Sequence, residues 1–184
     1  MIIISAPSGS GKTTIVKYIM SLVPNFGFSV SATSRPPREG EKDGTDYFFM
    51  SPEEFRNGII TNRFAEWEEV YPGHFYGTLN SEIERIWSEG RHIIFDVDVK
   101  GGISLKKAFG DKALSLFIMP PDIDALRKRL MMRATDSEEK IEMRVAKAEH
   151  ELTFAGEFDR VIINDILEIA QAEALKTVTE FMNN

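Results

Sequence analysis

The first chemically informative feature is a glycine-rich segment that directly follows an apolar run. Residues 6–13 read Ala-Pro-Ser-Gly-Ser-Gly-Lys-Thr, and the β-branched residues 2–4 precede them. Glycines let such a loop curl with its backbone N–H groups pointing inward, and a helix that starts there adds unpaired N–H groups and its positive dipole end. Lys12 would reach the β- and γ-phosphates of a nucleotide, and the Thr13 hydroxyl would ligate Mg²⁺. The segment therefore predicts a polyphosphate site.

One residue of this segment departs from the usual phosphate-loop template. The template normally starts with glycine, and this chain has Ala6 at that place. Alanine keeps the chain turning only at a negative φ, so the substitution weakens the match slightly. The alternative interpretation is a glycine-rich turn that binds nothing, but strand, loop, lysine, hydroxyl and helix start all agree with a phosphate site. The residues assigned to that site are Ala6, Pro7, Ser8, Gly9, Ser10, Gly11, Lys12, Thr13 and Thr14.

A second informative region is the polar stretch 31–41. Arg35 and Arg38 are three residues apart with two prolines between them. The stiff diproline presets the two guanidinium groups as a fork for a phosphate or a carboxylate. Tyr47 and Tyr76 could add hydroxyl donors to the same oxygens. A basic loop of this kind is usually solvated surface, but its position after a phosphate loop favours an anion site.

The elements that must position these residues alternate between strand and helix at both ends of the chain. Short apolar runs indicate strands, and apolar residues at helical spacing indicate helices. The expected strands are 2–4, 47–50, 64–70, 92–96, 114–119 and 161–163. The expected helices are 13–22, one starting at Ser51-Pro52, 81–89, 102–108, 122–132, one from Thr135 or Asp136 to about 154, and a terminal one through 170–181.

This alternation predicts an α/β fold with a parallel sheet covered by helices on both faces. The strand-rich stretch of roughly 32–80 does not fit the alternation, and we interpret it as a small inserted subdomain. A chain of 184 residues that is 42% hydrophobic fits one compact domain.

Composition excludes several classes of function. The net charge of −7 argues against a dedicated nucleic-acid binder. The absence of cysteine excludes disulfides and thiolate metal sites. The sequence has no secretory signal and no long apolar stretch, and it is strand-like from Met1 onward, so we expect no targeting extension, no membrane partner and a cytoplasmic location.

Taken together, these segments resemble the guanylate kinases. The resemblance rests on the phosphate loop, Ser31 through Glu41, Asp46-Tyr47, Phe64-x-Glu66-Trp67, Tyr76-Gly77-Thr78, Asp96-Val97-Asp98-x-x-Gly101, Arg129-Leu130, Arg133, Arg144 and Val161-Ile162-Ile163-Asn164-Asp165. It spans essentially the whole chain with its spacing preserved. It implies a three-layer, nucleoside monophosphate kinase-like fold with a core of about 1–30, 81–120 and 157–184, a mixed α+β GMP-binding insert of about 31–80, and a helical lid with flanking helices of about 121–156.

The resemblance implies an enzyme of purine nucleotide metabolism that transfers the γ-phosphoryl group of ATP to GMP, giving ADP and GDP, with Mg²⁺ as cofactor. The family positions that grip the GMP phosphate match Arg35, Arg38, Tyr47 and Tyr76. The implied GMP-binding set is Ser31, Arg35, Arg38, Glu41, Tyr47, Glu66, Tyr76, Thr78 and Asp98.

Guanine recognition falls, by this resemblance, on Ser31, Glu66 and Thr78. Guanine presents its N1–H and N2–H₂ donors side by side, so one carboxylate can accept both while a hydroxyl donates to O6. Adenine lacks the N1–H and would leave such a carboxylate badly paired. Glu66 belongs to the run Glu66-Trp67-Glu68-Glu69, so without the family pattern it could equally be a solvated acid on a strand.

Two aspartates follow an apolar strand at 92–95. The resemblance assigns to Asp96 a water-mediated hold on Mg²⁺, alongside Thr13. Asp98 would contact the metal shell or GMP, or alternatively cap the next helix. The family usually has glutamine where this chain has Lys100, so no role is carried over to that residue.

The implied lid supplies positive charge to the reaction. Arg129 and Arg133 are four residues apart on one helix and Arg144 lies on the next, and with Lys12 they form the implied catalytic set that clamps the ATP phosphates. Ala134 stands where the family more often has glycine, which predicts a stiffer or displaced hinge. Asn164 matches a family position near adenine, or is simply a turn residue.

Two alternatives stay open at this point. The chain could be a phosphate-loop kinase of another small acceptor, or a guanylate-kinase-like module that binds peptides without catalysis. The intact Gly11-Lys12-Thr13 argues against the second. The sequence leaves open whether the protein is a monomer or a homodimer, and whether it accepts dGMP.

Overall fold

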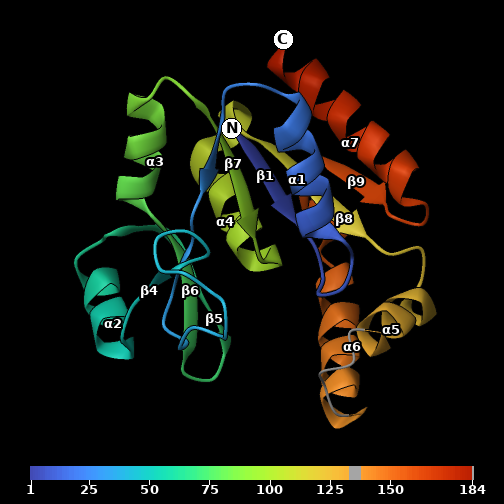
Figure 1. The fold of residues 1–184 in the computed structure, drawn as a ribbon, viewed down its shortest axis with the longest axis horizontal. Coiled ribbons are helices and arrows are strands. Elements are labelled where there is room, and N and C mark those ends of the chain that lie inside the picture. The colour runs from blue at the N-terminus through green and yellow to red at the C-terminus, as the bar shows by residue number, and fades with distance from the viewer. Residues whose placement is uncertain (133–137, 184) are drawn as a thin grey trace.

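The centre of the molecule is a five-stranded parallel sheet. The computed structural model describes residues 1–132 and 138–183, and the strand order is β2-β7-β1-β8-β9 (Figure 1). The strands are β1 Ile2–Ser5, β2 Phe26–Ser29, β7 His92–Val97, β8 Leu114–Met119 and β9 Arg160–Ile163. Every neighbouring pair is parallel, so the carboxyl ends of all five strands lie at one edge of the sheet.

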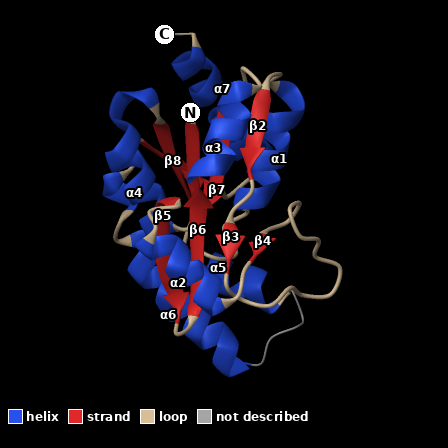
Figure 2. Cartoon of the chain, turned by 90° about the vertical axis from the view of Figure 1, so that its left-hand side faces the viewer, coloured by secondary structure: helices blue, strands red, loops and turns tan. Residues whose placement is uncertain are grey.

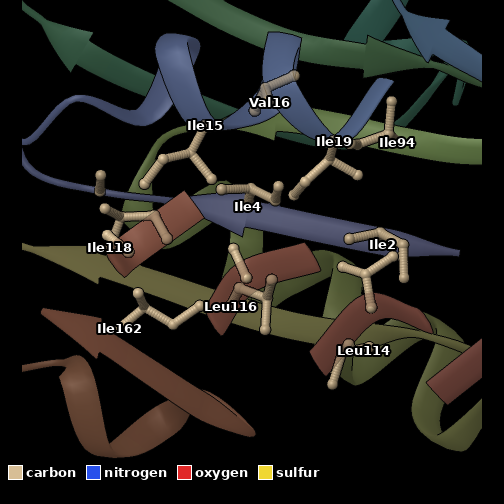
Figure 3. Close-up of a cluster of buried hydrophobic side chains, with 14 of the residues drawn as sticks. Ile2, Ile4, Ile15, Val16, Ile19, Ile94, Leu114, Leu116, Ile118 and Ile162 are labelled. Atoms are coloured by element: carbon tan, nitrogen blue, oxygen red, sulfur yellow. The ribbon is translucent and has the colours of Figure 1, made fainter. Parts of the chain in front are cut away.

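Helices cover both faces of this sheet. One face carries α1 Lys12–Leu22 and α7 Leu167–Met182, and the other carries α3 Asn80–Ser88 and α4 Val99–Phe109. Because side chains alternate along a strand, Ile2 and Ile4 pack under α1 and α7 while Ile3 packs under α3 and α4. Figure 3 shows Ile15 and Ile19 of α1 beside Ile4. Figure 2 shows the central strands between α4 and α1, which confirms the predicted three-layer α/β class.

A second sheet lies beyond the carboxyl edge of the first (Figure 1). Its strand order is β4-β3-β6-β5, with β3 Ala32–Thr33, β4 Phe48–Phe49, β5 Phe64–Tyr71 and β6 His74–Leu79. Helix α2, Pro52–Ile60, packs on it. The ring of Phe55 stacks on Phe64 at 4.3 Å and on Phe75 at 5.6 Å between centroids. This sheet therefore has an aromatic core of its own.

The start of α2 is the helix end that the sequence predicts best. The Ser51 hydroxyl accepts a hydrogen bond from the Glu54 N–H at 3.1 Å, and the Glu54 carboxylate accepts one from the Ser51 N–H at 2.7 Å. Pro52 occupies the first helical position. This is the predicted capping box, in which two otherwise unpaired N–H groups are satisfied reciprocally.

Two further helices form a pair beside the sheets. These are α5 Ile123–Met131 and α6 Glu138–Leu152, which pack through Leu126 and Leu130 against Val145 and Ala148. The predicted caps of α6 at Thr135 or Asp136 lie outside the described residues. Short 3₁₀ turns occur at Gly110–Lys112 and Ala155–Glu157. Among the described residues, every helix is too short or too polar to cross a lipid bilayer.

The structure differs from the sequence expectations in four elements. The apolar pattern does not indicate β2, β3 or β6, and the helix expected at 102–108 begins at Val99. Strand β3 has two residues, while β2 and β6 each contain a glycine that weakens strand propensity. These strands form because partner strands hold them. Helix α4 starts early because the Asp98 carboxylate accepts a hydrogen bond from the Gly101 N–H at 2.8 Å and caps it.

Candidate functional site

A cavity of about 670 Å³ lies at the carboxyl edge of the central sheet. It is bounded by the glycine-rich loop, the second sheet and helix α6. Such a position is where open parallel sheets bind ligands. The lining residues that the sequence analysis had assigned to a site are Ala6 through Thr14, Ser31, Glu41, Tyr47, Glu66, Tyr76, Asp96, Asp98 and Arg144.

The glycine-rich loop joins β1 to α1 with two left-handed glycines. Gly9 has φ 92° and Gly11 has φ 89°, a conformation that L side chains rarely adopt. No side chain caps α1, and no acidic residue lies in its first turn. Because the residues of this turn line the cavity, the helix directs its first N–H groups and its positive dipole end toward it. Among the described non-glycine residues only Asn25 and Asn62 have a positive φ, so alanine at the template's first glycine brings no left-handed strain.

Lys12, Thr13 and Asp96 converge at the mouth of the loop. The Lys12 ammonium forms an ion pair with the Asp96 carboxylate and donates to the Val97 carbonyl at 2.7 Å. The Thr13 hydroxyl lies 3.4 Å from Asp96 Oδ2. A hydroxyl and a carboxylate oxygen are ligands that suit Mg²⁺, which usually keeps several waters and takes substrate phosphates as further ligands.

Asn164 contacts the glycine-rich loop, and Arg129 contacts Asn164. The Asn164 side-chain amide donates to the Ser10 carbonyl at 2.7 Å, and Arg129 Nη2 donates to the Asn164 carbonyl at 2.8 Å. Arg129 Nη1 and Asn164 Oδ1 are buried and have no hydrogen-bond partner within residues 1–132 and 138–183. Neither residue lines the cavity. A Cβ at Gly11 would clash with Asn164 Nδ2, so the close approach of the Asn164 side chain to the loop requires glycine at this position.

Arg35 is held on every side by groups of the second sheet and its loop. It is 8% exposed, and its Nε donates to the Tyr76 hydroxyl at 3.1 Å. Both of its terminal nitrogens donate to Glu41, one to each carboxylate oxygen at 2.6 Å. The guanidinium also lies 4.9 Å from the centre of the Tyr47 ring. These hydrogen bonds lower the pKa of Glu41 to about 2 and raise the pKa of Arg35.

Arg38 differs from Arg35 in being exposed. Its backbone N–H donates to Glu41 Oε2 at 2.7 Å, so Glu41 fixes the start of this turn as well as the buried guanidinium. The two arginines predicted to form a fork thus have different surroundings. One is fixed in a buried network, and the other is at the surface.

Glu66 is the buried carboxylate of the second sheet. It is 7% exposed, whereas Glu69 on the same strand is exposed, so burial distinguishes glutamates that the sequence could not. Thr78, its partner across β5 and β6, donates its hydroxyl to Glu66 Oε1 at 2.7 Å. Burial raises the pKa of Glu66 to about 7, and the nearby Asp98 carboxylate adds to the effect. Ser31 is half-buried and lines the same end of the cavity.

Asp98 faces the cavity and also caps a helix. Its Oδ1 accepts from the Gly101 N–H at 2.8 Å, which is the capping alternative, and its side chain lines the cavity. The two interpretations are therefore compatible. Within residues 1–132 and 138–183, no group of three or more His, Asp or Glu residues forms a cluster able to chelate a metal.

Helix α6 places charged residues over the cavity that sequence reasoning missed. Arg144 was expected there, but Lys147 and Glu151 also line the cavity. The Lys147 ammonium lies 3.5 Å from Glu151 and 4.5 Å from the centre of the Tyr71 ring on β5. Burial raises the pKa of Glu151. The spacing of three and then four residues from Arg144 was the available signal, because such residues share one helix face.

The remaining arginine of the expected catalytic set is Arg133, which lies outside the described residues, as does Ala134. The role expected for Arg133 stays a prediction.

Comparison with known proteins identifies the family. A family model described as guanylate kinase matches residues 1–184. A guanylate kinase of Bacteroides fragilis is 58% identical over 182 residues, which are 99% of this chain and 89% of that protein. A guanylate kinase of Porphyromonas gingivalis is 50% identical over 183 residues, covering 99% of this chain and 97% of that one. The crystal structure of a guanylate kinase from Anaplasma phagocytophilum is similar with a TM-score of 0.77 at 27% identity, covering 98% of this chain and 84% of that chain. On its sequence and its fold, this chain belongs to the guanylate kinase family.

Proposed function

We infer that this chain transfers the γ-phosphoryl group of ATP to GMP, giving ADP and GDP. The observation that carries this inference is one cavity with two unlike ends. One end is a glycine-rich loop at a helix N-terminus, which suits the phosphates of ATP. The other end is lined by Glu66, Tyr76 and Glu41. Thr78 holds the Glu66 carboxylate, and the Arg35 guanidinium, which does not itself line the cavity, is bonded to Tyr76 and Glu41. These groups suit guanine and its phosphate.

At the donor end, we propose that the backbone of residues 6–14 binds the ATP phosphates. Lys12 exchanges its Asp96 partner for phosphate oxygens, and Thr13 and Asp96 would hold Mg²⁺, Asp96 through water. When bound, Mg²⁺ neutralises charge on the phosphates. The free nitrogen of Arg129 and the side chain of Arg144 supply further positive charge, as Arg133 is predicted to do. The main contribution of the protein is alignment and charge stabilisation.

The proposed role of Asn164 follows from its contacts. Its amide holds the Ser10 carbonyl and its backbone carbonyl holds Arg129. We propose that it acts on ATP mainly by shaping the phosphate loop. A direct contact with adenine stays a prediction.

At the acceptor end, we propose that Glu66 accepts the N1–H and N2–H₂ donors of guanine while hydroxyls of Ser31 and Thr78 complete the base site. Asp98 flanks this site. The GMP phosphate binds Arg35, Arg38 and the hydroxyls of Tyr47 and Tyr76. Glu41 acts through Arg35, because it holds both terminal nitrogens of that side chain. The GMP phosphate is itself an anionic nucleophile, so no general base is required.

We further propose that the chain is divided as the resemblance implies. The core is about 1–30, 81–120 and 157–184, the GMP-binding insert about 31–80, and the lid with its flanking helices about 121–156. In support, all four strands of the second sheet fall within 32–79 and have a separate aromatic cluster. Lys147 over the ring of Tyr71 is a contact between the lid and the insert.

The test is ADP release from ATP and Mg²⁺ with GMP, dGMP, AMP, UMP, CMP and dTMP as separate acceptors. Activity confined to guanine nucleotides, and lost in Lys12→Ala, is the expected result. Turnover with another base instead would keep the phosphate loop and discard the guanine assignment of Glu66. Binding without turnover for every acceptor would favour the non-catalytic module.

A further inference from the structure

Gly101 occupies the closest approach between the core and the guanine end of the cavity. It lies buried in the first turn of α4, which packs against β5 of the second sheet. A Cβ at Gly101 would lie 2.7 Å from Glu66 Oε2 and 3.2 Å from Asp98 Oδ1. Real Cβ atoms do not approach an oxygen as closely as the first of these distances, because the two atoms repel each other well inside their contact distance. One of the carboxylates would have to move.

The backbone of Gly101 does not itself require glycine. Its φ is not in the left-handed region, unlike that of Gly9 or Gly11, and glycine is a poor residue for the interior of a helix. The neighbouring Gly102 has a different reason to be small, since its Cβ would meet Ser5 Oγ on the central sheet. The side chain missing at Gly101 therefore leaves space for a carboxylate of the insert.

The two oxygens of Glu66 have different surroundings. Oε1 accepts from the Thr78 hydroxyl at 2.7 Å, and Oε2 is the atom that a Cβ at position 101 would meet first. A methyl group at position 101 would push the Oε2 side of the carboxylate away from α4 while Thr78 still holds the other side. The two oxygens would then no longer lie where two neighbouring N–H donors of one flat base can reach them.

We propose that Gly101 is a specificity-determining position, which sets the orientation of the Glu66 carboxylate toward guanine through the space that its missing side chain leaves. The inference rests on the proposed role of Glu66. Gly101 acts by positioning the Glu66 carboxylate and not by contacting GMP, so it is a positioning residue.

The first test is steady-state kinetics of Gly101→Ala. We expect the KM for GMP to rise by about tenfold or more, because a mispaired buried polar group is strongly unfavourable, while the KM for ATP stays within about twofold. The preference for GMP over inosine monophosphate, which lacks the 2-amino group, should fall. The control is Gly156→Ala, because no atom of the described part of the chain lies within 4 Å of a Cβ there. Equal changes in both KM values, or an unchanged preference, would overturn the proposal.

The second test measures thermal unfolding and remains informative if Gly101→Ala folds poorly. We compare the effect of Gly101→Ala in the wild type and in Glu66→Ala. If Glu66 fills the space, the substitution lowers the midpoint by about 3 °C or more in the wild type and by clearly less when the Glu66 side chain is absent. An equal decrease in both backgrounds would overturn the proposal.

Failure of this inference and failure of the proposed function have different signatures. If Glu66→Ala leaves the KM for GMP unchanged, the guanine-reading role of Glu66 fails and the inference fails with it. If Glu66→Ala raises that KM and Gly101→Ala does not, only the role of Gly101 fails.

Discussion

The two ends of the cavity are built in opposite ways. The end that we propose binds ATP, the donor end, consists of consecutive residues 6–14, and its binding groups are backbone N–H groups arranged by two left-handed glycines. The end that we propose binds GMP, the acceptor end, depends on side chains from a loop and several strands. Among these, Glu66 is buried at the cavity wall, and Arg35 and Thr78 are buried behind the residues that line it. A backbone site tolerates most side-chain changes, whereas each member of a side-chain site is needed. We therefore expect substitutions to impair activity at only one or two positions of the donor end, and at many positions of the acceptor end.

We expect the largest effect from Lys12→Ala, which removes the ammonium group of the donor end. Lys12 is the lysine of that end, paired with Asp96 and the Val97 carbonyl, and its charge cannot be replaced by the backbone. We expect kcat to fall by about 10³-fold or more with the fold retained, measured by ADP release and by thermal unfolding. Lys176→Ala on the exposed face of α7 is the control. Near-normal turnover in Lys12→Ala would contradict the phosphate-loop assignment.

We expect the next largest effect from Glu66→Gln, which removes the buried carboxylate of the acceptor end. The amide would present an N–H₂ group to the donors of guanine, so we expect kcat/KM for GMP to fall by about 10²-fold with little change in the KM for ATP. Glu69→Gln is the matched control, because Glu69 lies exposed on the same strand. Similar losses in both variants would mean that the buried carboxylate does not read the base.

The pH dependence of GMP binding tests the same role of the Glu66 carboxylate. Burial raises the pKa of Glu66 to about 7 in the free protein, and guanine needs the ionised carboxylate. The protonated form therefore increases as the pH falls below about 7, and the KM for GMP should rise by about tenfold per pH unit well below that value. Above it the KM should be flat. The measurement is the KM for GMP between pH 5.5 and 8.5, on the order of three units across the expected pKa.

The control for this profile is Glu66→Gln. The GMP phosphate also titrates, near a pH of about 6, and the glutamine variant keeps that titration while losing the carboxylate. We expect the variant to have a weaker pH dependence than the wild type. Identical profiles would assign the whole dependence to the nucleotide.

The smallest expected effect belongs to Glu41→Gln, which loosens Arg35 without removing it. The carboxylate holds both terminal nitrogens of the guanidinium, and an amide can accept from only one of them well. We expect the KM for GMP to rise by about three- to tenfold, with kcat and the KM for ATP nearly unchanged. Glu39→Gln in the exposed part of the same loop is the control. An unchanged KM for GMP would mean that Tyr47 and Tyr76 suffice to hold Arg35.

The contrast between the two ends also explains what the sequence could predict. The proposed phosphate loop was recognisable as a motif because its residues are consecutive and the chain order keeps them together. The Ser51 capping box was recognisable for the same reason. By contrast, β2, β3 and β6 are short or contain glycine, and they form only because partner strands are present.

The side-chain contacts of the acceptor end could not be predicted locally. Three glutamates within four residues have similar sequence surroundings, and only packing against β6 and α4 buries Glu66. The pairing of Arg35 with Glu41 was likewise hidden, because the same two arginines could equally have pointed into solvent. The resemblance to a family named these residues, but it did not state what holds them.

The sequence by itself determined the fold class, the family and the place of the phosphate loop, because periodicity and consecutive motifs are local properties of the chain. Only the tertiary structure decided which carboxylate is buried, that Glu41 holds Arg35, that Lys147 and Glu151 face the cavity, and that Gly101 leaves room for Glu66. The physical reason is that burial, pKa shifts and steric limits arise between segments far apart in the sequence, and they exist only once those segments have packed together.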